Sequence, residues 1–120
     1  MANEISVSAS LGVSKNGAST RRNESLSVDM AGEAFYHAIQ NVSTSNEILE
    51  VYAPGGIDAA ETGYVFIKNL DSSNYVEFGL TGSYTIKLLA GEVALFRAAG
   101  ALYARANTSA VEVEVIMVEL

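Results

Sequence analysis

The sequence predicts an all-β protein, an antiparallel β-sandwich of the jelly-roll type that forms a single domain over residues 1–120. Short runs of alternating apolar and polar residues recur roughly nine or ten times, at intervals of about 8–12 residues. Turn-forming residues separate these runs, and none has a convincing helical period. A chain of 120 residues is long enough to bury a core without disulfides, and this one has no cysteine.

The first two strands are expected near the N-terminus. Residues 5–13 alternate between apolar side chains and serine or glycine, which predicts a strand with one buried face and one small, neutral face. Asn16-Gly17 is a strong signal for a two-residue turn. A return strand is expected over 25–30, with 20–24 as either its polar start or a loop.

The next segment, 34–42, is compatible with two structures. Phe35, Ile39 and Val42 are spaced as on a helix, but the flanking strands and the loop-like residues that follow favour a strand. Another strand is expected over 48–52. Pro54-Gly55-Gly56 should end it, because proline breaks strand pairing.

The central segment, 63–79, predicts a β-hairpin. Its arms, 64–67 and 75–78, are rich in β-branched and aromatic residues, and 69–74 between them favours a turn. Both faces of the first arm are apolar, because successive side chains alternate between faces. We therefore expect a cover on each face, one from the core and the other from a second layer or another chain.

Four further strands are expected, over 84–89, 93–98, 102–106 and 111–119. In the last one, the alternation predicts a buried face with these members: Val111, Val113, Val115 and Met117. Glu112 and Glu114 should face outwards. Paired carboxylates can hydrolyse sugars from separate strands of a cleft, but these two share one strand, which favours an exposed or edge strand protected by its charge.

The composition excludes some classes of function. The net charge is −7, and the only basic cluster is Arg21-Arg22, so nucleic-acid binding is not expected. That pair either contacts an acidic neighbouring subunit or is simply solvated. No stretch is apolar enough to cross a bilayer, and the N-terminus lacks the pattern of a signal peptide. An apolar fraction of 49 % with 18 % charged residues mildly favours an oligomer.

We find no catalytic, cofactor-binding or metal site in the sequence. His37 is the only histidine, and nothing nominates a partner for it, which favours a structural or interface role. Asp71 with 72–74 weakly resembles a calcium loop but lacks the alternating carboxylates, so turn chemistry is the better interpretation. The glycines form no phosphate-binding loop, and no serine lies in a nucleophile motif.

Six tyrosines are present, and the following lie on or beside predicted strands: Tyr52, Tyr64, Tyr75, Tyr84 and Tyr103. Tyrosine at a strand end can stack on a sugar or anchor an interface. Each of them can equally belong to the core, and this second interpretation is favoured residue by residue.

The second half of the chain resembles small structural proteins of tailed bacteriophages. The resemblance rests on three segments, 63–79 (FIKN-D-NYVE-G), 88–97 (L-AGE-ALFR) and 102–110 (YA-A-T-A). It implies a virion component assembled in the bacterial cytoplasm, without enzymatic activity or cofactor. The role we expect is a capsid decoration, or cement, protein that stabilises the head shell.

The resemblance also implies partners, which are the major capsid protein or other virion proteins. A closed homo-oligomer is expected, and a trimer on a capsid threefold axis is a natural arrangement. The alternative is a carbohydrate- or receptor-binding β-sandwich of a tail or head fibre, supported by the tyrosines and the polar loops. A small hydrolase ranks last, since an enzyme needs a cleft with convergent polar groups.

Overall fold

The computed structural model describes residues 3–32, 34–52 and 56–120. The chain divides into two compact units, Met1–Ala31 and Gly32–Leu120. The sequence pattern predicts one sandwich domain over all of 1–120. In the structure, the two sheets of the sandwich are built entirely from strands of the second unit, and the first unit forms a sheet of its own.

The first unit is a long antiparallel hairpin of β1 (Ile5–Lys15) and β2 (Ala18–Val28). The predicted Asn16-Gly17 turn is confirmed, with φ values of 53° and 82°. Positive φ at both central residues matches the twist of paired strands, and asparagine followed by glycine adopts it readily. Residues 20–24, for which a loop was one alternative, belong to β2.

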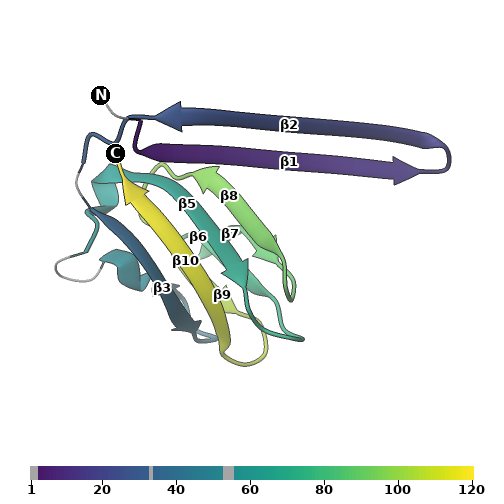
Figure 1. The fold of residues 1–120 in the computed structure, drawn as a ribbon. Helices are drawn as coiled ribbons and strands as arrows, with labels where there is room; N and C mark the ends of the chain where they lie inside the picture. The colour runs from purple at the N-terminus through teal and green to yellow at the C-terminus, as the bar shows by residue number, and fades with distance from the viewer. Residues whose placement is uncertain (1–2, 33, 53–55) are drawn as a thin grey trace. The chain divides into compact units, whose positions relative to one another are not determined.

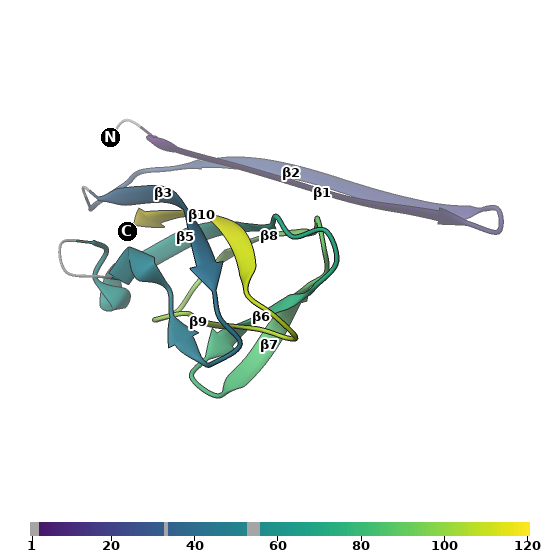
Figure 2. The same cartoon turned by 90° about the horizontal axis from the view of Figure 1, so that it is seen from below.

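The second unit is a sandwich of two four-stranded antiparallel sheets (Figures 1 and 2). The first sheet has the order β3 (Phe35–Val42), β10 (Val111–Glu119), β5 (Thr62–Asn69) and β8 (Val93–Arg97). The second has the order β4 (Glu47–Ile48), β9 (Tyr103–Ala106), β6 (Val76–Leu80) and β7 (Ser83–Leu88). Seen along the sheets in Figure 2, the labelled strands of the two sheets lie in separate layers.

The strand order is that of a jelly roll. Counting β3 as the first strand and β10 as the eighth, the sheets read first-eighth-third-sixth and second-seventh-fourth-fifth. Every connection crosses between the sheets except the one from β6 to β7. Two interlocked Greek keys of this kind define the jelly roll, so the predicted fold class is confirmed.

The predicted central hairpin over 63–79 is wrong. β5 pairs with β10 and β8, whereas β6 pairs with β9 and β7, so the two arms lie in different sheets. The segment between them turns a corner of the sandwich. Turn-forming residues are common to hairpins and to such corners, and the sequence pattern does not distinguish the two.

The strand expected over 48–52 is also largely wrong. β4 ends at Ile48, and a single 3₁₀ turn, η1 (Glu50–Tyr52), follows. The backbone N–H of Glu50 donates a hydrogen bond of 2.8 Å to the side chain of the buried Gln40, and not to a neighbouring strand. Two of the three residues of the turn predicted at 54–56, which are 54 and 55, lie outside the described residues. A second 3₁₀ turn, η2 (Ala59–Glu61), leads into β5.

The core lies between the two sheets. The four predicted members on β10 are fully or almost fully buried, as are Val65 and Ile67 of β5 and Phe78 of β6. The strand assignment of 34–42 is confirmed as β3. Within the described residues, no helix has the length and apolar character needed to span a membrane.

The buried face predicted for the first strand is not observed along most of its length. Ile5 is buried and Val7 partly so, but Leu11 is 79 % exposed and Val13 59 % exposed. The apolar residues of β1 stand opposite those of β2, as in the pairs Ile5–Val28 and Val7–Leu26. A two-stranded sheet has no second layer of its own, so its alternation does not guarantee burial.

Candidate functional site

The most distinctive surface of the sandwich is the outer face of the β3-β10-β5-β8 sheet. The strand register aligns His37, Ile116, Phe66 and Leu95 in one row across all four strands. Neighbouring rows add further large apolar side chains. We call the following set the apolar outer face: Phe35, Ile39, Phe66, Val93, Leu95 and Ile116.

Four members of the apolar outer face are substantially exposed. Phe35 is 71 % exposed, Ile39 60 %, Val93 55 % and Leu95 38 %. Burying a side chain of this size is worth about 1.5–3 kcal/mol relative to leaving it in water. An apolar surface that runs across neighbouring strands is typical of a protein–protein contact.

His37 has a partner on this face that the sequence did not nominate. Its Nε2 lies 2.7 Å from Oε2 of Glu114, on the neighbouring strand β10. Both side chains are partly exposed, at 54 % and 32 %. The pair joins β3 to β10. Among the described residues, no nucleophilic side chain interacts with it, so a structural role fits this pair better than a catalytic one.

The acidic strand is not an edge strand. β10 lies inside the sheet, between β3 and β5, so the carboxylates do not protect an open edge. The prediction that they face outwards is confirmed, with Glu112 exposed and Glu114 partly exposed beside His37. A fully buried inner face beside an acidic outer face is typical of a central strand as well as of an edge.

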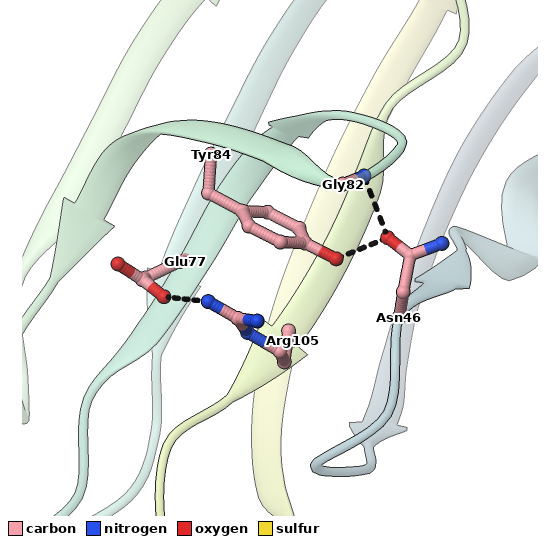
Figure 3. A network of polar contacts seen from close by, with 5 residues as sticks. All are labelled: Asn46, Glu77, Gly82, Tyr84 and Arg105. Atoms are coloured by element: carbon pink, nitrogen blue, oxygen red, sulfur yellow. Dashed lines mark hydrogen bonds and ion pairs between the residues drawn. The ribbon is translucent and has the colours of Figure 1, made fainter.

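The outer face of the opposite sheet is polar and aromatic. Arg105 of β9 donates a hydrogen bond of 3.0 Å to Glu77 of β6 and lies over the Tyr84 ring at 4.5 Å (Figure 3). The hydroxyl of Tyr84 donates to Oδ1 of Asn46, which also accepts from the backbone N–H of Gly82 at 3.3 Å. This network holds the β6–β7 turn against the segment that precedes β4.

Cations cover three of the tyrosine rings. Lys87 lies 4.1 Å from the centre of the Tyr75 ring, Arg105 lies over Tyr84, and Arg97 lies 6.0 Å from Tyr64. Hydrogen bonding to Glu77 raises the pKa of Arg105, which keeps its guanidinium charged. A ring face that is covered by a cation is not open to stack on a sugar.

Tyr52 and Tyr103 are less accessible. The hydroxyl of Tyr52 lies 3.0 Å from that of Thr62, and burial raises the pKa of Tyr52. Tyr103 is partly buried in β9. The favoured interpretation of these tyrosines, as part of the packing, agrees with this placement.

The loop at Asp71 uses its carboxylate for turn chemistry. Oδ2 accepts hydrogen bonds from the backbone N–H groups of Asn74, at 2.7 Å, and Ser73, at 3.0 Å. These bonds lower the pKa of Asp71. The interpretation of this segment as a turn is thus supported, and the carboxylate oxygen that a cation would need is already engaged.

A shallow groove of about 320 Å³ lies on the sandwich. Among the described residues that line it, Arg97 is the only ionisable one, and the rest are mainly apolar: Gly79, Leu80, Ser83, Thr85, Ile86, Phe96 and 98–102. General acid–base chemistry needs at least two suitable groups that converge on a substrate. In the described parts of the chain, no three histidine, aspartate or glutamate side chains gather as a metal site either.

Arg21 and Arg22 lie on opposite faces of β2, not in a loop. Arg22 forms an ion pair with Glu24, while the Arg21 side chain lies near Gly12, its opposite residue on β1. Both arginines are exposed.

Comparison of the chain with protein-family models, with curated protein sequences and with solved structures gave no match.

Proposed function

We propose that this protein is a non-enzymatic structural component of a bacteriophage virion, a capsid decoration protein that binds and stabilises the head shell. The observation that carries the proposal is the apolar outer face. A sandwich that has already buried its own core still exposes Phe35, Ile39 and Val93 on one sheet. Such a surface is suited to permanent assembly with other subunits.

The resemblance of 63–110 to small phage structural proteins supports the same function. The first partner is a second copy of the chain, in a closed symmetric oligomer such as a trimer. The second is the major capsid protein or another virion protein. The site of action is the virion, after assembly in the cytoplasm of the bacterial host.

The polar outer face around Tyr84 is the surface on which a carbohydrate-binding function would depend. Its tyrosine rings are covered by Lys87 and Arg105, Glu77 accepts a hydrogen bond from Arg105, and the amide of Asn46 accepts one from the Tyr84 hydroxyl. A sugar would have to displace these contacts. For this reason we prefer assembly over glycan binding.

The proposal is tested by adding the purified chain to phage heads that lack it. We expect saturable binding to the shell and a higher temperature of shell disruption. A Phe35→Ser, Ile39→Ser double variant should bind less and protect less, whereas Leu80→Ser, Leu89→Ser, a control that removes exposed apolar side chains elsewhere, should behave like the wild type. A chain that ignores the shell but is retained on cell-surface glycan would overturn the proposal in favour of receptor binding.

A further inference from the structure

The hairpin of β1 and β2 is an incomplete structure on its own. All of its residues from Ser8 to Ser27 are exposed, including Leu11 at 79 % and Leu26 at 46 %. An isolated two-stranded hairpin is at best marginally stable in water, and needs a further strand or a packed face. The apolar side chains of this hairpin therefore require a partner.

The two faces of the hairpin differ sharply. The register places Val7, Leu11, Val13 and Leu26 on one face, which also carries Lys15, Arg22 and Glu24, the ion-pair partner of Arg22, and therefore has a net positive charge. The other face is built mainly from small polar residues, including the opposed pairs Ser6–Ser27 and Ser8–Ser25, and it also carries Arg21. We call the first one the apolar face of the hairpin, and it is the one that gains from burial.

Charge is distributed unequally between the two units. Three of the 7 basic and three of the 14 acidic residues lie in Met1–Ala31, which leaves four basic and 11 acidic residues, net −7, for Gly32–Leu120. Within the hairpin, Ser10–Asn23 holds Lys15, Arg21 and Arg22 and no carboxylate. The end of the hairpin around its turn is thus basic, and the sandwich is strongly acidic.

One part of the sandwich matches the hairpin in both respects. The β3–β10 half of the sheet exposes Phe35 and Ile39, and beside them lie the exposed Glu112 and the partly exposed Glu114, which is paired with His37. The other half, on β5 and β8, carries Lys68 and Arg97 instead. An apolar strand pair with arginine among its side chains is complementary to the β3–β10 half and not to the β5–β8 half.

We propose that the hairpin of one copy docks through its apolar face onto the outer face of β3 and β10 of a second copy. Each strand of the hairpin has 11 residues, whereas the longest strand of the sandwich has 9. At a rise of about 3.4 Å per residue, the hairpin is longer than the sheet strand on which it would lie, so it can reach across to a second subunit. The contact buries Leu11, Val13, Phe35 and Ile39 together. Arg22 is then close to the carboxylates of β10. This inference specifies a contact within the oligomer of the proposed function. It rests on that function only because it assumes that the chain is an assembly protein.

Disulfide cross-linking tests the proposal, because the chain has no cysteine of its own. Two full-length copies with tags of different mass are co-expressed, one as Leu11→Cys and the other as Ile39→Cys, and are then oxidised. Both positions are exposed, so the folding of each copy should be little affected. A mixed cross-linked dimer is expected. The matched control, Ser10→Cys with Ile39→Cys, places the thiol on the opposite face of β1 and should give little or none.

A chain that carries both Leu11→Cys and Ile39→Cys separates docking between copies from docking within one copy. Cross-linking only within the single chain would overturn the proposal, and so would the absence of any cross-link. As a second measurement, Arg22→Glu in the cysteine-bearing hairpin should lower the yield of the mixed dimer more than Arg21→Glu on the opposite face does, and added salt should also lower it. A yield unchanged by Arg22→Glu and by salt would contradict the charge argument.

The cross-linking result is independent of the shell-binding result. If the wild-type chain decorates shells but the mixed dimer does not form, the docking proposal fails and the proposed function stands. If the dimer forms but the chain does not bind shells, the docking proposal stands and the proposed function fails. The two experiments share no variant and no readout.

Discussion

The side-chain amide of Asn69 donates a hydrogen bond of 3.0 Å to the backbone carbonyl of Leu88, and so joins β5 of one sheet to β7 of the other. Asn69 is fully buried. Its amide also donates to the carbonyl of Asn74 at 2.9 Å, and its Oδ1 accepts from the N–H of Asp71 at 2.8 Å. One side chain therefore fixes the corner at which the chain passes between sheets.

Replacing this asparagine should destabilise the sandwich strongly. Asn69→Ala removes the partner of three backbone groups, of which each costs about 1–3 kcal/mol when left buried and unpaired, so we expect a total loss of about 2–4 kcal/mol after relaxation. Urea unfolding measures it. Asn41→Ala, at an exposed position of β3, is the control and should change stability by less than about 0.5 kcal/mol. Equal effects of the two variants would contradict this account of the corner.

Gly79 is required by the close approach of β6 and β7. A Cβ at this position would lie 2.3 Å from the backbone oxygen of Ser83, where the ladder between the two strands is irregular. Gly79→Ala should therefore force the strands apart and cost about 1–3 kcal/mol, as overpacking does elsewhere. Gly100→Ala has open space around its new methyl group and serves as the control. Thermal unfolding of both variants decides whether the steric contact is the cause.

Glu61 provides a test by pH. The negative charge of Glu119, and a hydrogen bond to it, raise the pKa of Glu61. A carboxyl whose pKa is raised on folding favours the folded state while protonated, and this contribution is lost as the pH rises through the raised value. Glu61→Gln should therefore be more stable than the wild type at neutral pH, with the difference closing below about pH 4. Unfolding at the two pH values measures this difference, and a variant less stable at neutral pH would contradict the repulsion.

Asp71 should show the opposite behaviour. Backbone hydrogen bonds from Asn74 and Ser73 lower its pKa, so its stabilising effect is present above the ordinary aspartate value and is lost as the pH falls through the lowered one. Asp71→Ala should be less stable than the wild type at neutral pH, and the gap should narrow below about pH 3. Ser72→Ala is the neighbouring control. Since Asp71 is engaged in the turn, calcium should leave the unfolding curve unchanged, and a stabilising shift with calcium would contradict this role.

The individual strands could be predicted from the sequence better than their arrangement. The period of two and the turn residues identify β1, β3 and β10 closely, and the buried face of β10 is correct residue by residue. The pairing depends on contacts distant along the chain, which local patterns do not encode. For the same reason, the sequence could not predict that 63–79 crosses between sheets.

The surfaces illustrate the same limit. His37 and Glu114 lie 77 residues apart in sequence and meet only because β3 and β10 are paired. The sequence predicts an apolar outer side for β5, because both sides of that strand are apolar. It does not predict that the apolar outer face extends over β3 and β8, because this depends on the order of the strands in the sheet. The alternation in β1 predicted burial, and only the pairing shows that the hairpin has no second layer of its own.

The mass of the chain in solution tests the central claim most directly, which is that the apolar outer face is an assembly surface. Light scattering should give a multiple of 12.7 kDa for the wild type. The Phe35→Ser, Ile39→Ser variant should move towards 12.7 kDa, while Leu80→Ser, Leu89→Ser keeps the wild-type mass. A wild-type chain that remains monomeric at every concentration would contradict the account, as would an oligomer that the substitutions on β3 leave intact.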